Sequence, residues 1–122
     1  MARIGRIPFW KWIPSRAWRI VTTTGAADEI PEHLPSHGAV IVGSVKRPKW
    51  LAFDCPCGTG HRIMLTLDPA HFPHWVVRSG KKLSVSPSVD SRTAGRRCHF
   101  YITNGKIKWV ENRNGGLYGR RR

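Results

Sequence analysis

Short apolar runs alternate with turn-forming residues along most of the chain. Four runs have the length and composition of β-strands, at residues 17–24, 38–43, 62–67 and 75–78. A further stretch at 83–86 alternates apolar and polar residues. No segment repeats its apolar residues with the period of an amphipathic helix. The pattern predicts a mostly β protein, built as a small single-domain antiparallel sheet or sandwich.

The segment 99–110 has the clearest hairpin pattern. Its centre, Asn104-Gly105, is the preferred dipeptide for a two-residue type I′ turn. That turn would set three pairs across the hairpin: Phe100 with Trp109, Tyr101 with Lys108 and Ile102 with Ile107. The alternation then predicts an apolar core face and a polar face that carries His99.

Two segments before this hairpin are predicted to be irregular. Ser86-Pro87-Ser88 reads as a turn in which the hydroxyls bond to nearby backbone groups. Residues 90–97 are polar and basic, and they read as a loop. Together they would separate the strand at 83–86 from the last hairpin.

Charge divides the chain into three parts. Residues 1–20 form a basic, tryptophan-rich N-terminal arm, residues 21–112 a β-rich core domain, and residues 113–122 a flexible basic tail. Pro8 and Pro14 argue against a continuous helix in the arm. Its aromatic and arginine side chains would suit bases and phosphates or a membrane interface, and packing of some aromatics on the domain is the alternative.

The whole sequence is strongly basic. Lys and Arg number 21 against 7 acidic residues, for a formal net charge of +14. Nucleic acid, an anionic membrane surface or an acidic protein would all be attracted to such a chain. No apolar run is long enough to be a transmembrane segment, and no secretory signal is present. With an odd number of cysteines, three, we expect a cytoplasmic protein.

The three cysteines lie in two short segments, each with a histidine nearby. Cys55 and Cys57 flank a proline and are followed by His61, while Cys98 directly precedes His99. Zinc is usually held by four sulfur or nitrogen ligands. A tight turn at Pro56 and Gly58 would direct both sulfurs to one point. The pattern predicts a zinc (Zn2+) site of Cys55, Cys57 and Cys98, completed by His99 or His61.

Two alternatives remain for these cysteines. Buried thiols often serve only as small apolar side chains, and a disulfide or redox pair is the other possibility. The strand pattern also limits the site. If the last hairpin already runs through Cys98, then Cys98 and His99 point to opposite faces, and both bind one ion only where the chain is irregular.

The order of short motifs along residues 28–110 resembles a small bacterial family. The motifs stand here as Ile30-Pro31-Glu32, Cys55-Pro56-Cys57-Gly58, Trp75, Ser86-Pro87-Ser88-Val89, Cys98-His99-Phe100-Tyr101-Ile102, Gly105 and Trp109. Family members resemble accessory proteins encoded beside bacterial ubiquitin-like conjugation systems, which have E1-like, E2-like and peptidase components. Thr59 stands where members tend to carry a further cysteine, and the family's later cysteine usually lies a few residues before its histidine.

The resemblance implies a role in making, processing or removing a ubiquitin-like tag, with antiviral defence as its setting. It implies as partners the ubiquitin-like protein or the E1-like and E2-like proteins of the same operon. A peptidase of this kind would use a zinc ion with an open ligand position, or Ser86 or Ser88 as nucleophile with His99 as base.

Two non-enzymatic functions compete with the hydrolase. A closed structural zinc would stabilise a binding module for nucleic acid or an acidic protein, which the net charge favours. The sequence has no RNA-recognition, helix-turn-helix or C2H2 pattern. A membrane-surface protein that uses the N-terminal arm is the other alternative.

Overall fold

The chain folds mainly as β-strands. The computed structural model describes residues 7–12, 15–44, 46–58, 60–80, 82–93 and 96–110. The elements within these ranges are η1 (Phe9–Trp12), β1 (Arg19–Thr24), η2 (Ala27–Glu29), β2 (Gly38–Gly43), β3 (Pro48–Asp54), β4 (Arg62–Thr66), β5 (Val76–Ser79), β6 (Leu83–Thr93), β7 (Arg96–Thr103) and β8 (Lys106–Trp109). Neither short 3-10 helix among them has the length or apolar character needed to cross a bilayer.

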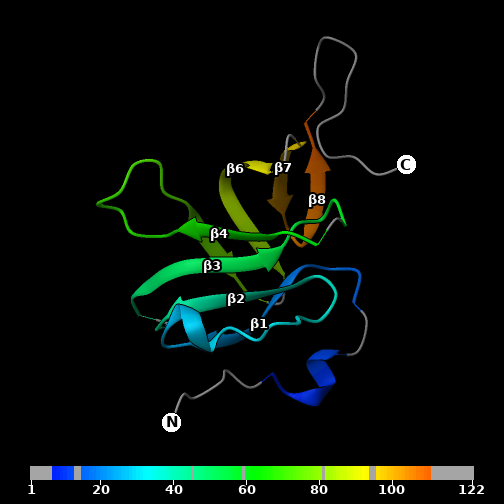
Figure 1. The fold of residues 1–122 in the computed structure, drawn as a ribbon, viewed down its shortest axis with the longest axis vertical. Coiled ribbons are helices and arrows are strands. Elements are labelled where there is room, and N and C mark those ends of the chain that lie inside the picture. Colours follow the sequence, from blue (N-terminus) through cyan, green and yellow to red (C-terminus); the bar gives the residue numbers. More distant parts are fainter. Residues whose placement is uncertain are drawn as a thin grey trace.

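The strands form two four-stranded sheets, each in chain order, β1-β2-β3-β4 and β5-β6-β7-β8. Strands β2 to β4 run across the view in Figure 1, whereas β7 and β8 lie vertically in it with opposite directions, so the two sheets cross. The predicted mostly β architecture is confirmed. The first sheet is mixed, because β1 pairs with β2 in parallel. The loop 25–37, which contains η2, returns the chain to the same end of the sheet, as a parallel pair requires.

The main core lies between the two sheets. Phe53 on β3 and Phe100 on β7 are fully buried, and their ring centroids lie 6.3 Å apart in an edge-to-face contact. Trp18 extends this contact on one side, 5.7 Å from Phe53, and Trp109 on the other, 5.3 Å from Phe100. Such pairs are favourable beyond the area they bury, and they join the sheets through the middle of the molecule.

The outer faces of the two sheets differ. Behind the first sheet lies a smaller buried cluster of Val21, Val40 and Ala52, covered by Ile7, Ile30 and Leu34. The second sheet exposes Val76 and Tyr101 on its outer face, at 55% and 45%. Within the described part of the chain, this is the face on which polar side chains of β6 and β7 reach solvent.

The last hairpin follows the predicted register. Phe100 pairs with Trp109 and Ile102 with Ile107, and both Asn104 and Gly105 adopt the left-handed conformation of a type I′ turn. The prediction of a loop at 90–97 is wrong for most of that segment, because β6 continues to residue 93 and β7 begins at residue 96. Its polar residues pair across the strands, so high polarity here marks an outer strand face.

The predicted terminal segments are described only in part. Residues 1–6, 13 and 14 of the arm and the whole of the predicted tail at 113–122 lie outside the described residues. In the rest of the arm, η1 exposes Phe9, Trp10 and Trp12. Trp18 is 5% exposed and belongs to the main core.

Trp18 is also held by backbone hydrogen bonds to the second sheet. Its amide donates to the carbonyl of Gly105 at 2.8 Å, and its carbonyl accepts from the amide of Leu83 at 2.9 Å. The amide of Gly105 in turn donates to the carbonyl of Leu83 at 2.7 Å. The hairpin turn is therefore part of the packed structure.

We expect Gly105→Ala to destabilise the protein by about 1–3 kcal/mol, because φ is +79° there and the added Cβ would lie 3.0 Å from the Cβ of Ala17. Gly80→Ala is the matched control, since a Cβ at Gly80 meets nothing within 4 Å. Urea unfolding of both variants measures the difference. Equal free energies of unfolding for the two variants would contradict the role given to the turn.

Candidate functional site

Three cysteines and one histidine meet inside the molecule. The sulfurs of Cys55, Cys57 and Cys98 and a ring nitrogen of His61 all lie within 4.8 Å of one another. Cys55 and Cys57 come from the connection between β3 and β4, whereas Cys98 lies on β7 of the other sheet. The cluster thus joins the two sheets, and its residues could hold a metal ion.

The connection between β3 and β4 is a closed turn. The amide of Gly58 donates to the carbonyl of Cys55 at 3.2 Å, and the amide of Cys55 donates to the carbonyl of His61 at 2.9 Å. Gly58 has a φ of +79°, a conformation that glycine adopts without a steric penalty. These bonds direct the two sulfurs and the His61 ring to one side of the turn. Thr59 lies outside the described residues.

The donor set fits a bound cation. All three cysteines are buried and lie within the described residues. They form no disulfide with one another. Burial raises the pKa of the Cys55 thiol well above its usual range, and the neighbouring side chains of Cys57 and Cys98 raise it further. A divalent cation reverses this preference, because its charge stabilises the thiolates that bind it.

His99 lies outside this cluster, on the opposite face of the sheet. Cys98 and Phe100 on either side of it point into the core, so the alternation of the strand turns His99 outward. There its Nε2 lies 3.0 Å from Oγ of Ser88, and both residues are half-buried. Of the two histidines considered as the fourth ligand, the structure brings only His61 to the sulfurs.

An irregularity in β6 brings Ser88 to His99. Val85 pairs with Ile102 and Val89 with Phe100, so the three residues 86–88 lie opposite the single residue Tyr101. Extra residues of this kind bend a strand and redirect a side chain, and they are common beside active sites. The predicted turn at Ser86-Pro87-Ser88 is therefore an interruption within a strand.

Ser86 is placed differently from Ser88. It is exposed and pairs with Val76 of β5 on the side of β6 away from β7. Of the two serines considered as nucleophile, Ser88 is the one whose hydroxyl is recorded in contact with the His99 ring.

Two further residues, Asp90 and Arg97, lie at this site and were not predicted from the sequence. Asp90 stands opposite His99 in the β6–β7 ladder and forms a two-point ion pair with Arg97, at 2.9 and 2.6 Å. Hydrogen bonds from Arg97 lower the pKa of the Asp90 carboxyl, and the charges of Arg97 and His99 add to this effect. Asp90 was assigned to a loop, so its cross-strand position was not visible from the sequence pattern.

Trp75 supports the backbone at the irregular part of β6. Its indole Nε1 donates to the carbonyl of Ser88 at 3.2 Å, and its own amide donates to the carbonyl of Thr66 at 2.9 Å. The residue thus bridges the end of the first sheet and the irregular part of β6.

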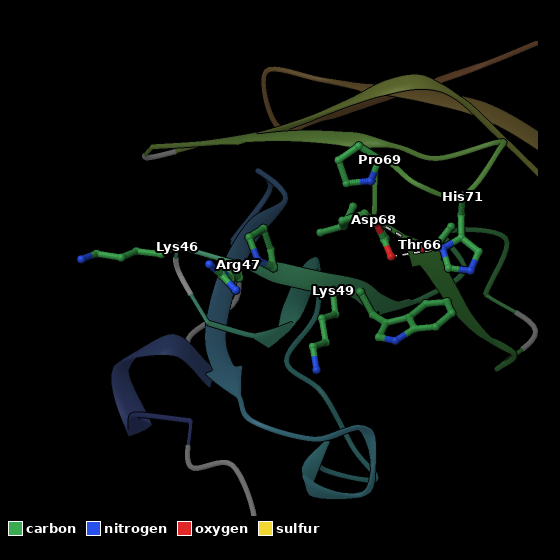
Figure 2. A pocket seen from close by; sticks show the side chains of 10 residues that line it. Lys46, Arg47, Lys49, Thr66, Asp68, Pro69 and His71 are labelled. Atoms are coloured by element: carbon green, nitrogen blue, oxygen red, sulfur yellow. Dashed lines mark hydrogen bonds and ion pairs between the residues drawn. The ribbon is translucent and has the colours of Figure 1, made fainter.

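A hollow of about 740 Å3 lies at the start of β3 and the end of β4. In Figure 2, Lys46 and Lys49 on its rim extend away from each other, so these cations do not converge on one point. Asp68 contacts His71 at 3.2 Å, and its amide donates to the hydroxyl of Thr66 at 3.4 Å. No bond drawn in Figure 2 joins the Thr66 hydroxyl to the His71 ring. The residues drawn there therefore do not form the hydroxyl–histidine contact that Ser88 and His99 make.

Comparison with known proteins places the chain in a family. Residues 26–110 match the family described as bacterial ubiquitination-like system serine protease (BubE). Neither the curated proteins nor the solved structures give a match. The matched segment contains β2 to β8, the cysteine cluster, Ser88 and His99. Because the match spans well over half of its length, the chain belongs to the BubE family of bacterial ubiquitination-like system serine proteases.

Proposed function

We propose that this protein is a serine peptidase in which Ser88 is the nucleophile and His99 the general base. The observation that carries the proposal is the 3.0 Å contact between Ser88 Oγ and His99 Nε2. A nucleophile and a base within hydrogen-bond reach are the minimum arrangement for nucleophilic catalysis by serine. The family's description as serine proteases supports the same chemistry.

Another hydroxyl–histidine contact fits less well. Ser36 Oγ lies 3.2 Å from His37 Nδ1, but the two residues are neighbours in the chain and Ser36 is exposed. Ser88 and His99 are held instead by two paired strands, which position side chains more accurately than a loop does.

The geometry supports the following sequence of steps. The Ser88 hydroxyl donates its proton to His99 Nε2 as Oγ forms a bond to the substrate carbonyl carbon. The His99 imidazolium then protonates the leaving amine as the scissile C–N bond breaks, which leaves an acyl-enzyme on Ser88. Water, deprotonated by His99, releases the acyl group and restores the serine. The carboxylate of Asp90 belongs to the residue that stands opposite His99 in the β6–β7 ladder.

We also propose that the cysteine cluster holds a structural zinc ion. Cys55, Cys57, Cys98 and His61 would hold it, since their ligand atoms lie within 4.8 Å of one another, and four protein ligands are the set typical of a structural zinc. When bound, the ion would cross-link the β3–β4 turn to β7. Because Cys98 adjoins His99, the same cross-link would fix the backbone that carries the general base.

The proposed substrate is a ubiquitin-like protein of the same operon, or a conjugate of it. The family's association with bacterial ubiquitination-like systems supports this assignment. The E1-like and E2-like proteins of the operon are the proposed functional neighbours. The net charge of +14 favours acidic partner surfaces in general, and it does not select one of them.

We expect Ser88→Ala and His99→Ala each to lower kcat/KM for cleavage of the operon's ubiquitin-like protein by at least about a thousandfold, because each removes one partner of the proton transfer. Ser36→Ala and His33→Ala are matched controls, since both residues are exposed and far from Ser88 in the chain. Mass spectrometry of the products measures the rates and identifies the cleaved bond.

A folded Ser88→Ala variant that cleaves as fast as the wild type would exclude this nucleophile. Loss of activity in Ser36→Ala instead would move the site to the Ser36–His37 pair. No cleavage by the wild type at any metal concentration would leave only the non-enzymatic binding module.

We expect one zinc ion per chain in the purified protein, and we expect its removal by a chelator to lower the melting temperature reversibly. Cys98→Ser should lose the ion, stability and activity together. His99→Ala should keep the ion and the fold while losing activity. Elemental analysis and thermal unfolding measure these quantities. A metal-free wild type whose melting temperature does not respond to added zinc would contradict the structural role.

A further inference from the structure

A second hollow, of about 530 Å3, lies in the open face of the second sheet between β5, β6 and β7. Its volume is within the range typical of ligand sites. The lining residues are Val76, Arg78, Ser84, Val85, Ser86, Ile102 and Thr103. Ser88 and His99 are not part of this lining, but Ser86 is, two residues before Ser88 on the same strand.

The hollow lies beside the interruption of β6. Val85 and Ile102 form the last regular pair before the ladder shifts, and both are buried core residues at 4% and 1% exposure. Ser86, the first of the three residues opposite Tyr101, also lines the hollow. The interruption that places Ser88 beside His99 is therefore at the edge of the hollow.

The lining carries one exposed apolar side chain, three hydroxyls and one charge. Val76 is 55% exposed, whereas Val85 and Ile102 are buried core residues, and Ser84, Ser86 and Thr103 supply neutral hydrogen-bonding groups. Arg78 is the charged residue of the lining, which contains no acid. None of the ion pairs recorded among the described residues includes Arg78. Its guanidinium has a planar set of donors that matches a carboxylate.

We propose that this hollow binds the substrate residues next to the scissile bond and that Arg78 pairs with a carboxylate they carry. The proposal rests on the proposed function, because it takes Ser88 as the nucleophile that cleaves the substrate. The carboxylate belongs either to an Asp or Glu side chain or to the C-terminus of a substrate whose last residues are removed. Both have the chemistry that a guanidinium recognises.

The test uses internally quenched peptides based on the C-terminal residues of the operon's ubiquitin-like protein. Each position is Glu, Gln or Lys in turn, and each peptide is made with a free and with an amidated C-terminus. For the wild type we expect kcat/KM to be at least about tenfold higher for Glu than for Lys at one position, or for the free than for the amidated terminus. The first result assigns the carboxylate to a side chain and the second to the chain end.

Substitutions at Arg78 then connect the preference to the hollow. Arg78→Gln should abolish it, and Arg78→Glu should reverse it in favour of Lys. Lys108→Glu is the matched control, because Lys108 is an exposed cation of the same sheet, opposite Tyr101, that does not line the hollow. It should leave the preference unchanged. Arg78 is exposed, so the variants should keep the wild-type melting temperature.

The outcomes separate this inference from the proposed function. A wild type that cleaves the peptides without a carboxylate preference, or with one that Arg78→Glu leaves intact, overturns the inference alone. If Lys108→Glu changes the carboxylate preference as much as Arg78→Glu does, the inference is also overturned. The effect would then come from the overall charge of the sheet and not from Arg78. If neither these peptides nor the ubiquitin-like protein is cleaved, both proposals fail.

Discussion

The structure depends on the alternation of two adjacent residues on β7. Cys98 points into the core, where it joins the sulfurs of Cys55 and Cys57, and His99 points out to Ser88. A slip of β7 by one residue would exchange these faces and destroy both sites at once. The register is held by the ladders to β6 and β8 and by the Asn104-Gly105 turn. Because Cys98 and His99 are consecutive residues of β7, the backbone joins the cysteine cluster in the core directly to the Ser88–His99 contact on the outer face.

Strand β6, in contrast to β7 and β8, departs from regular pairing between Val85 and Val89. Regular pairing would leave no extra residues between Val85 and Val89, and the serine would occupy a different position relative to His99. The interruption has a cost, because backbone groups that leave a ladder need other partners. The indole of Trp75 supplies one of them at the carbonyl of Ser88. This contact gives Trp75 a structural reason to lie beside residues 86–88.

Local patterns predicted the hairpin and the strands well. Asn104-Gly105 specified the turn and hence the pairing of Phe100 with Trp109, because turn type fixes register over a few residues. The turn at Cys55 and Cys57 was also predictable because its chemistry is local, whereas the grouping with Cys98 of the other sheet followed from the number of ligands that zinc needs. The alternation of side chains along a β-strand also predicted that Cys98 and His99 would point to opposite faces of the sheet.

Contacts between distant segments could not be predicted in the same way. The parallel pairing of β1 with β2 depends on the path of a long loop. The length of β6 was underestimated because its outer half is polar, and the outward position of Asp90 opposite His99 followed from that length. The choice of Ser88 over Ser86 required knowledge of where the ladder shifts, which no local sequence signal records.

The backbone of Trp18 has a consequence for how the domain can be divided. Its amide and carbonyl lie between the Gly105 turn and Leu83, and its indole fills part of the core. A shortened chain that starts at residue 21, where composition alone would set the boundary, would uncover one edge of the Phe53 ring and remove the partners of the Gly105 carbonyl and the Leu83 amide. The packed core thus includes a residue of the segment that its charge assigns to the arm.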